Sequence, residues 1–276
     1  MRILGLLSCA LLGALLIAIA ADFPEWGDAH SPASEHLSPY FIEHTMEDTS
    51  VPNIVTSVLA DYRGYDTMFE TIVVFCAGIA CFFLLGSYAC AEPEERFYRS
   101  VETGVVLRFT GDARPRPDSP CFERIDPRWT PRDIIISMVG RIMVPFIQIY
   151  ALYVVAHGHH SPGGGFQGGV ILGAAFILLA LSSNLRTMTR CIDHKVLGVL
   201  SALGVMIYAG VGVTCMVMGS NFLDYAALHT ILGVSPVAAR SLGILFVEVG
   251  VAMTVMATMV VIYNNVASAG RYEEGL

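Results

Sequence analysis

Ionisable side chains inside apolar stretches are the residues best placed to do chemistry in this chain. Glu248 lies in the run 242–251, where every other residue is apolar or glycine. Glu70 and Arg141 lie near the ends of two other apolar stretches. A charged side chain in the centre of a bilayer costs about 2.5–3.5 kcal/mol on insertion scales. We therefore expect these three residues to face protein or water, as parts of a pathway for protons or cations.

Each of these residues also has a structural interpretation. Thr67 and Glu70 have the spacing of a capping box, in which Thr67 caps a helix and the Glu70 carboxylate returns to its amide. Alternatively, Asp66 and Glu70 form a carboxylate pair able to hold a cation, because two close carboxylates raise one pKa. Arg141 can extend to the membrane surface or pair with an acid. For Glu248, where no helix terminus is expected nearby, the alternatives are a protonated glutamate bonded to another helix and an ion relay.

A cluster of histidines and glycines joins two apolar stretches at 157–169. His157, His159 and His160 can titrate near neutral pH and would suit proton transfer at a membrane surface. A metal site among them is disfavoured by the turn-rich setting, and the segment lacks the Gly-Lys-Ser/Thr ending of a phosphate-binding loop. The glycines predict a tight turn between antiparallel helices. The residues of this structural turn are Pro162, Gly163, Gly164, Gly165 and Phe166.

Composition and hydropathy indicate which elements position these residues. Of the 276 residues, 54% are hydrophobic and only 14% charged, and the mean hydropathy is +0.61. An average globular protein has about 25% charged residues, so the outside of this chain must face lipid. A helix needs about 20 apolar residues to cross a bilayer. We predict an all-α integral membrane protein with six transmembrane helices, at about 3–21, 68–90, 134–156, 165–183, 196–219 and 240–263.

The first apolar stretch has two interpretations. Arg2, the apolar run and the small residues 18–21 fit a cleaved signal peptide. However, the apolar core of a signal peptide usually has about 7–15 residues, and this run is longer. The length favours a helix that is retained in the membrane.

The basic residues predict the orientation. With a cytoplasmic N-terminus, thirteen of the 16 lysines and arginines lie on the cytoplasmic side, and only Arg63 and Arg240 lie outside. This distribution follows the positive-inside rule. Both termini are expected in the cytoplasm, in a multi-pass protein of the inner (plasma) membrane.

The loops divide the chain into three parts. Residues 1–92 form a two-helix module with an acidic outer segment at 22–67, in which 54–60 reads as a short helix at the membrane surface. Residues 93–133 read as a cytoplasmic linker, rich in proline at 114–120. Residues 134–276 form a four-helix module.

Several classes of function are excluded. The seven cysteines form no CxxC or cysteine–histidine ligand spacing, so disulfide frameworks, zinc sites and iron–sulfur clusters are not expected. The net charge of −8 argues against a nucleic-acid partner. We expect a protein without a cofactor or an enzymatic activity of its own.

Two segments carry a family resemblance. The segments 158–166, Gly-His-His-Ser-Pro-Gly-Gly-Gly-Phe, and 243–255 resemble the B subunit of Mrp-type multisubunit sodium/proton antiporters. The segment 52–70 resembles the C-terminal piece of the antiporter's A-type subunit, a piece that is a separate small E-type subunit in membrane-bound hydrogenases. The chain thus looks like a fusion of E-type and B-type subunits.

The resemblance implies membership of a larger complex that exchanges sodium for protons, either free-standing or coupled to a hydrogenase or related redox arm. Asp66 and Glu70 match the carboxylates of the A-type tail, and Glu248 matches the acid of the last B-type helix. Met68-Phe69 and Ala252 depart from the family pattern. The alternative is a structural adaptor that joins the antiporter module to its neighbours and conducts no ions.

Overall fold

The computed structural model describes residues 2–88, 96–109, 121–125, 134–183 and 185–268. The chain divides into two units, 1–46 and 47–276. The first unit holds α1 (Arg2–Ala20), η1 (Ala33–Leu37) and the beginning of α2 (Ser38–Thr49). Helix α2 lies in a segment whose first part, rich in proline and serine, reads from the sequence as irregular.

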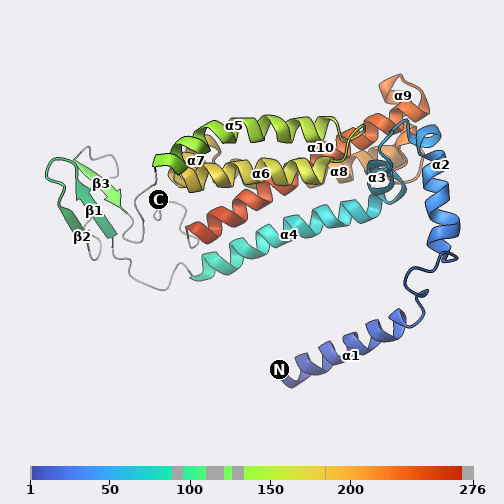
Figure 1. Ribbon diagram of the computed structural model, residues 1–276, viewed down its shortest axis with the longest axis horizontal. Coiled ribbons are helices and arrows are strands. Elements are labelled where there is room, and N and C mark those ends of the chain that lie inside the picture. Colours follow the sequence, from blue (N-terminus) through green and yellow to red (C-terminus); the bar gives the residue numbers. More distant parts are fainter. Residues whose placement is uncertain (1, 89–95, 110–120, 126–133, 184, 269–276) are drawn as a thin grey trace. The chain divides into compact units, whose positions relative to one another are not determined.

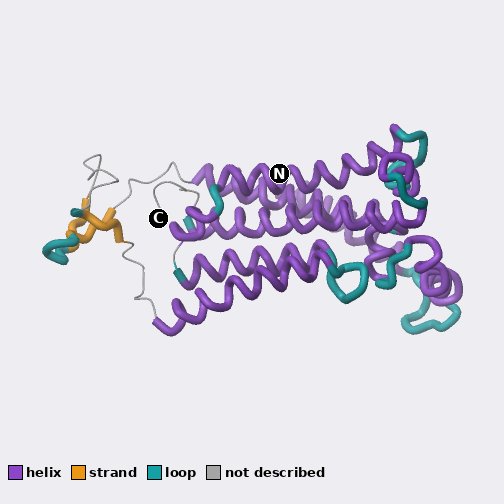
Figure 2. The backbone as a smooth tube through the Cα atoms, turned by 90° about the horizontal axis from the view of Figure 1, so that it is seen from above, coloured by secondary structure: helices purple, strands orange, loops and turns teal. Residues whose placement is uncertain are grey.

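Five long helices form the second unit, and they run side by side in both Figure 1 and Figure 2. With α1, they make six described helices that are long and apolar enough to cross a membrane. Their bounds lie within about four residues of the predicted spans wherever both ends are described. The five are α4 (Gly64–Tyr88), α5 (Ile134–Ala156), α6 (Gly165–Ser182), α8 (His194–Val217) and α10 (Pro236–Ala267).

Helix α10 is the core of this bundle, since most of its side chains are buried against α4, α6 and α8. It begins four residues before the predicted span because Ser235 caps its N-terminus and Pro236 occupies the first turn. Its polar residues include Glu248, two threonines and two asparagines, all buried. A polar set of this kind inside an apolar helix has to face other protein elements rather than lipid.

Glycines allow α6 and α8 to approach α10 closely. A Cβ atom at Gly165 would lie 2.1 Å from the Glu248 carbonyl oxygen, and one at Gly169 would lie 2.8 Å from the Ala252 carbonyl oxygen. The contacts advance in the same direction along both helices, so α6 and α10 are parallel. On α8, a Cβ atom at Gly204 would lie 2.3 Å from the Gly250 carbonyl oxygen. Small residues at such crossings are the usual basis of helix packing in membranes.

Short elements gather at one end of the bundle. They are α3 (Ile54–Ser57), η2 (Val58–Tyr62), η3 (Tyr225–Leu228) and α9 (His229–Leu232), while α7 (Leu185–Cys191) connects α6 and α8. The predicted short helix at 54–60 is confirmed as helical by α3 and η2. The end that holds α3, η2, η3 and the 157–164 turn is called the junction end below.

A small sheet is the one departure from an all-α fold in the described residues. Strand β1 (Arg96–Ser100) lies between β2 (Val106–Phe109) and β3 (Phe122–Ile125), and both pairs are antiparallel. The prediction that 93–133 is only a linker is therefore wrong for these strands, whose short alternating pattern is masked by the prolines between them. The proline-rich stretch 114–120 lies outside the described residues.

Candidate functional site

The Glu248 carboxylate lies in a cradle of glycine backbone at the N-terminus of α6. Glu248 is only 7% exposed. A Cβ atom at Gly164 would lie 2.6 Å from Oε1, and one at Gly158 would lie 2.9 Å from Oε2. The backbone amide of Gly165 donates a hydrogen bond to the carboxylate. Any side chain at these glycines would therefore displace the carboxylate.

The cradle corrects the expectation that no helix terminus is near Glu248. The terminus belongs to α6 rather than to α10, a tertiary contact that no pattern within the last helix could reveal. The positive end of the α6 dipole favours a negative charge at this position. Glu248 Oε2 nevertheless has no hydrogen-bond partner among the described residues. A buried oxygen of this kind requires a water molecule, a proton or a cation.

The triglycine turn has the backbone conformation that the cradle needs. Gly164, the residue before α6, has a φ of 126°, which side-chain-bearing residues rarely adopt. Gly163, with a φ of 157°, lies against Val154, and a Cβ atom there would be 2.8 Å from Cγ1 of that residue. The turn between antiparallel helices is confirmed, and its glycines serve both the backbone path and the approach of Glu248. Pro162 and Phe166 flank them and are exposed.

The three histidines of the turn have different environments. His157 is exposed and stacks on Tyr153, with 4.1 Å between the ring centroids. His159 is half-buried, and its Nε2 atom has no hydrogen-bond partner among the described residues. Burial, with a smaller contribution from His160, lowers the pKa of His159 below its usual value. The neutral form of His159 is therefore favoured in the fold.

A polar hollow of about 250 Å³ lies on the outer side of the turn. His160, Ser161 and Gln167 line it together with Asn53 from the first module. The Gln167 side chain connects the hollow to the carboxylate, since a Cβ atom at Gly164 would meet both Gln167 Oε1, at 3.7 Å, and Glu248 Oε1. Sequence patterns offered no reason to single out Gln167 or Asn53.

Asn53 joins the two modules at this turn. Its side-chain amide donates to the carbonyl oxygens of Gly158 and Ser161, each at 2.8 Å, and its backbone N–H donates to the His159 carbonyl oxygen. The Thr56 hydroxyl donates to the Gly158 carbonyl oxygen at 2.8 Å. The cap of α3 therefore holds the histidine turn in place. The only sequence signal for it was an asparagine directly before a short helical pattern.

Asp66 and Glu70 lie on one exposed face of α4, as their spacing predicts. Asp66 forms an ion pair with Arg63. The predicted capping box is wrong, because α4 already begins at Gly64 and the Thr67 hydroxyl donates to the Leu59 carbonyl oxygen instead. The helix begins earlier because Gly64 and Tyr65 can still continue the helical path after η2.

Tyr208 of α8 lies between the two modules. Its hydroxyl donates to the Gly64 carbonyl oxygen at 2.8 Å, and it interacts electrostatically with both Glu70 and Glu248. Tyr225 of η3 donates in the same way to the Ala60 carbonyl oxygen. Both tyrosines are fully buried. They connect the level of Glu70 on α4 with the level of Glu248 on α10.

An ion pair completes the junction end. Arg240, near the beginning of α10, lies 3.0 Å from Asp61 of η2 and 3.1 Å from Asp224. The Asp61 side chain is only 6% exposed. Burial raises the pKa of the Asp61 carboxyl, and the Arg240 guanidinium opposes this rise. Arg240 was noted in the sequence only for orientation, because a partner 179 positions away is invisible to local patterns.

Arg141 lies far from the cradle. It is exposed on α5, next to Gly140, whose added Cβ atom would meet Ser182 at the C-terminal end of α6. Glu248 lies at the other end of α6. At 1.5 Å per residue the two levels are about 25 Å apart. The structure thus brings Glu248 and the histidine turn together and leaves Arg141 outside this group. Within the described residues, no three His, Cys, Asp or Glu side chains are placed to hold a metal ion.

Two family models match the chain. Residues 135–261 match a domain related to the MnhB subunit of Na+/H+ antiporters, and residues 12–97 match MbhE, the E-type component of MBH. A Staphylococcus aureus protein described as putative antiporter subunit mnhB2 is 36% identical over 135 residues, which are 46% of this chain and 94% of that protein. An uncharacterised protein of Methanocaldococcus jannaschii is 30% identical over 75% of this chain and 73% of its own length.

Longer relatives contain both parts. A Rhizobium meliloti protein, described as a probable K+/H+ antiporter component of the fused A/B type, is 27% identical over 84% of this chain, which covers 22% of that protein. Two solved structures share the fold. A chain of the Mrp complex from Dietzia matches 94% of this chain with a TM-score of 0.52 at 23% identity, over 26% of its own length. A chain of an archaeal membrane-bound sulfane sulfur reductase matches 94% of this chain and 97% of its own length, with a TM-score of 0.50 at 24% identity.

Proposed function

Because the chain belongs to the MnhB-related family of antiporter subunits, with an MbhE-type segment before that domain, we propose that it contributes titratable groups to the exchange of sodium ions for protons. It acts as one membrane subunit of an Mrp-type complex, either free-standing or joined to a redox enzyme. Its partners are the other antiporter subunits. Both termini lie in the cytoplasm, and the membrane is the inner (plasma) membrane.

The observation that carries this proposal is the buried Glu248 carboxylate, with one oxygen bonded at the α6 N-terminus and the other unpartnered among the described residues. A carboxylate that served only to cap α6 would be stable with an amide in its place. An oxygen without a partner in a buried site instead leaves room to exchange a proton or a hydrated cation. Glu248 is therefore the central exchange site.

Access to Glu248 comes from two sides. The hollow beside His160 and Gln167 leads to the carboxylate from the junction end. On the other side, Asp66 and Glu70 collect cations on α4, and Tyr208 lies within electrostatic reach of both Glu70 and Glu248. His157 and His159 belong to the same approach. Arg141, about 25 Å away at 1.5 Å per residue, serves the opposite membrane surface.

The test is antiport by the complete complex in proteoliposomes. In Glu248→Gln the side chain keeps its size and its hydrogen bond to Gly165 but cannot titrate. We expect sodium-driven proton flux to fall at least about ten-fold, as for loss of an essential acid–base group, while the complex still assembles. Glu43→Gln, which changes an exposed acid of the first module, is the matched control. Normal flux in assembled Glu248→Gln complexes would remove Glu248 from the pathway.

A structural adaptor remains the second candidate, and one contact favours it. The hydrogen bond from Gly165 N–H to Glu248 satisfies one of the free amides of α6. An adaptor predicts that Glu248→Gln transports normally and that Glu248→Ala fails to assemble on a native gel. The two candidates therefore differ in the flux of the glutamine variant.

A further inference from the structure

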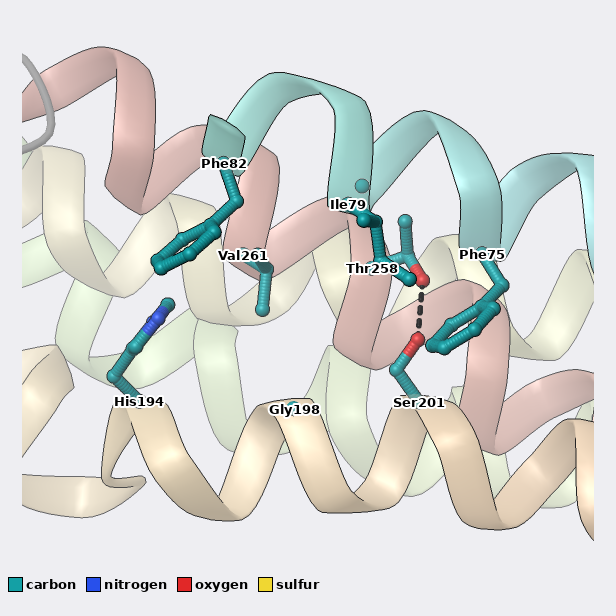
Figure 3. A pocket seen from close by; sticks show the side chains of 9 residues that line it. Phe75, Ile79, Phe82, His194, Gly198, Ser201, Thr258 and Val261 are labelled. Atoms are coloured by element: carbon teal, nitrogen blue, oxygen red, sulfur yellow. Dashed lines mark hydrogen bonds between the residues drawn. The ribbon is translucent and has the colours of Figure 1, made fainter. Parts of the chain in front are cut away.

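A groove between α4 and α8 has no role in the antiport pathway described above. It has a volume of about 280 Å³ and lies over α10, as Figure 3 shows. Phe75, Ile79 and Phe82 of α4 form one wall, and Gly198 leaves the opposite wall open, since nothing lies within 4 Å of an added Cβ atom there. The groove is therefore mostly apolar and is accessible from the side of the bundle.

The polar groups at the groove floor are already paired. Ser201 Oγ and Thr258 Oγ1 lie 2.7 Å apart and bond to each other. They therefore require no hydrogen bond from an occupant. An apolar chain can lie on this floor without leaving a polar group unsatisfied.

The groove is too narrow for a helix of another subunit. Helices α4 and α8 are tied together at one end by the Tyr208–Gly64 hydrogen bond and at the other end by the contact of the Phe82 and His194 rings, with 6.1 Å between centroids. A helix with its side chains is about 10–12 Å across. Only a thin, flexible chain can enter between the two helices.

The position of the groove along the bundle fits one leaflet of a bilayer. It extends from His194, the first residue of α8, to Ser201. Seven residues of helix span about 10 Å, and half of a hydrocarbon core is about 15 Å thick. The groove thus begins at a helix end and reaches towards the middle of the membrane, as the acyl chain of a lipid does.

Positive charge lies at the outer end of the groove. Lys195 is exposed beside His194, and the preceding helix α7 carries Arg186 and Arg190. Against these three cations in the segment 185–195 stands Asp193, the cap of α8. Basic residues next to a cleft between membrane helices favour lipids with anionic headgroups.

We propose that this groove binds one acyl chain of an anionic phospholipid, whose phosphate lies beside Lys195. The lipid fills the space between the E-type and B-type modules on the side away from the junction end. It stabilises the contact of α4 with α8 where glycines leave it incomplete. This site is independent of Glu248 and of the exchange of ions.

The test uses the whole complex in membranes that contain phosphatidylglycerol with a photoreactive diazirine on one acyl chain. We expect adducts on α4 and α8 at the groove. Gly198→Leu fills the open wall and should lower labelling at least about ten-fold, because a packed side chain excludes the acyl chain. Gly210→Leu is the matched control, since Gly210 also lies on α8 with open space around it and does not line the groove.

A second variant tests the headgroup without changing the groove. Lys195→Gln should lower labelling by the phosphatidylglycerol probe about five-fold, the effect of about one charge at an anionic surface. It should leave labelling by a phosphatidylcholine probe unchanged. Equal labelling of wild type and Gly198→Leu, or crosslinks from the groove to a side chain of another subunit in place of lipid, would overturn the proposal.

Discussion

At the scale of single residues, the glycines around Glu248 decide what that carboxylate can do. Gly158, Gly164 and Gly165 bring backbone amides and carbonyls to a position that side chains would otherwise occupy. The carboxylate thereby gains a helix N-terminus on one oxygen and space on the other. A buried acid is held without a basic partner among the described residues, a situation that fixed dipoles can support.

Gly165→Ala tests the close approach. The new Cβ atom would lie 2.1 Å from the Glu248 carbonyl oxygen, so α6 has to move away from α10. We expect a loss of about 1–3 kcal/mol in stability, typical of overpacking, measured as a lower thermal dissociation temperature of the complex. Gly210→Ala, with no atom within 4 Å of the added Cβ atom, should leave that temperature unchanged or slightly higher.

His159 gives the histidine turn a predictable pH dependence. Burial lowers the pKa of His159, so the folded state favours the neutral ring. The unfolded chain takes up a proton below a pH of about 6.5, and stability is therefore complete above that pH and lost as the pH falls. His159→Gln should reduce the loss of thermal stability between about pH 7.5 and about pH 5.5. An equal reduction in His36→Gln, an exposed control, would contradict this assignment.

Glu248 and the triglycine could be selected from the sequence because charge in an apolar run and clustered glycines are local signals. Their contact could not, because it joins positions more than 80 residues apart. Asn53, Gln167 and Tyr208 carried no local signal at all. An asparagine, a glutamine and a tyrosine at helix ends or in spans are common, and only the fold shows what each contacts.

At the scale of elements, the junction between the two modules is a set of side-chain bonds to exposed backbone. Asn53 bonds the 158–161 backbone, Tyr208 bonds Gly64, and Tyr225 bonds Ala60. The chain is irregular here, where α3 passes into η2 and η2 into α4. Backbone carbonyls freed by these irregular turns need partners when they are buried.

Tyr208→Phe is the sharpest test of this junction. The ring remains, but the Gly64 carbonyl oxygen loses its buried donor. We expect a cost of about 1–3 kcal/mol, the penalty of an unsatisfied buried group, seen as faster proteolysis of the 54–64 segment in the intact complex. Tyr150→Phe serves as the control because Tyr150 is 58% exposed on α5. Identical proteolysis of the Tyr208 variant and wild type would show that the hydrogen bond contributes nothing.

The spans were predictable because long apolar runs have few other solutions in a membrane protein. Helix ends were less so. The beginning of α4 depends on η2 before it, and the beginning of α10 depends on the Ser235 cap. The β1–β3 sheet was missed because its strands have only four or five residues each and stand among prolines and charges.

At the scale of the whole molecule, the E-type and B-type segments meet in one unit around α10. Helix α4 comes from the first segment, yet it packs on the last helix as α6 and α8 do. The junction end holds Glu248, the histidine turn and the Asp61–Arg240 ion pair. Joining both segments in one chain therefore keeps the two glutamates, Glu70 and Glu248, on either side of Tyr208.

The most direct test of this account is the protonation of Glu248 in the working complex. Infrared difference spectra of the complete complex in membranes, recorded as sodium replaces protons, should contain a carboxyl C=O stretching band that shifts in deuterium oxide and is absent in Glu248→Gln. The account predicts loss of that band together with loss of antiport. A complex that exchanges ions at the normal rate, with the same carboxyl bands in wild type and Glu248→Gln, would contradict it.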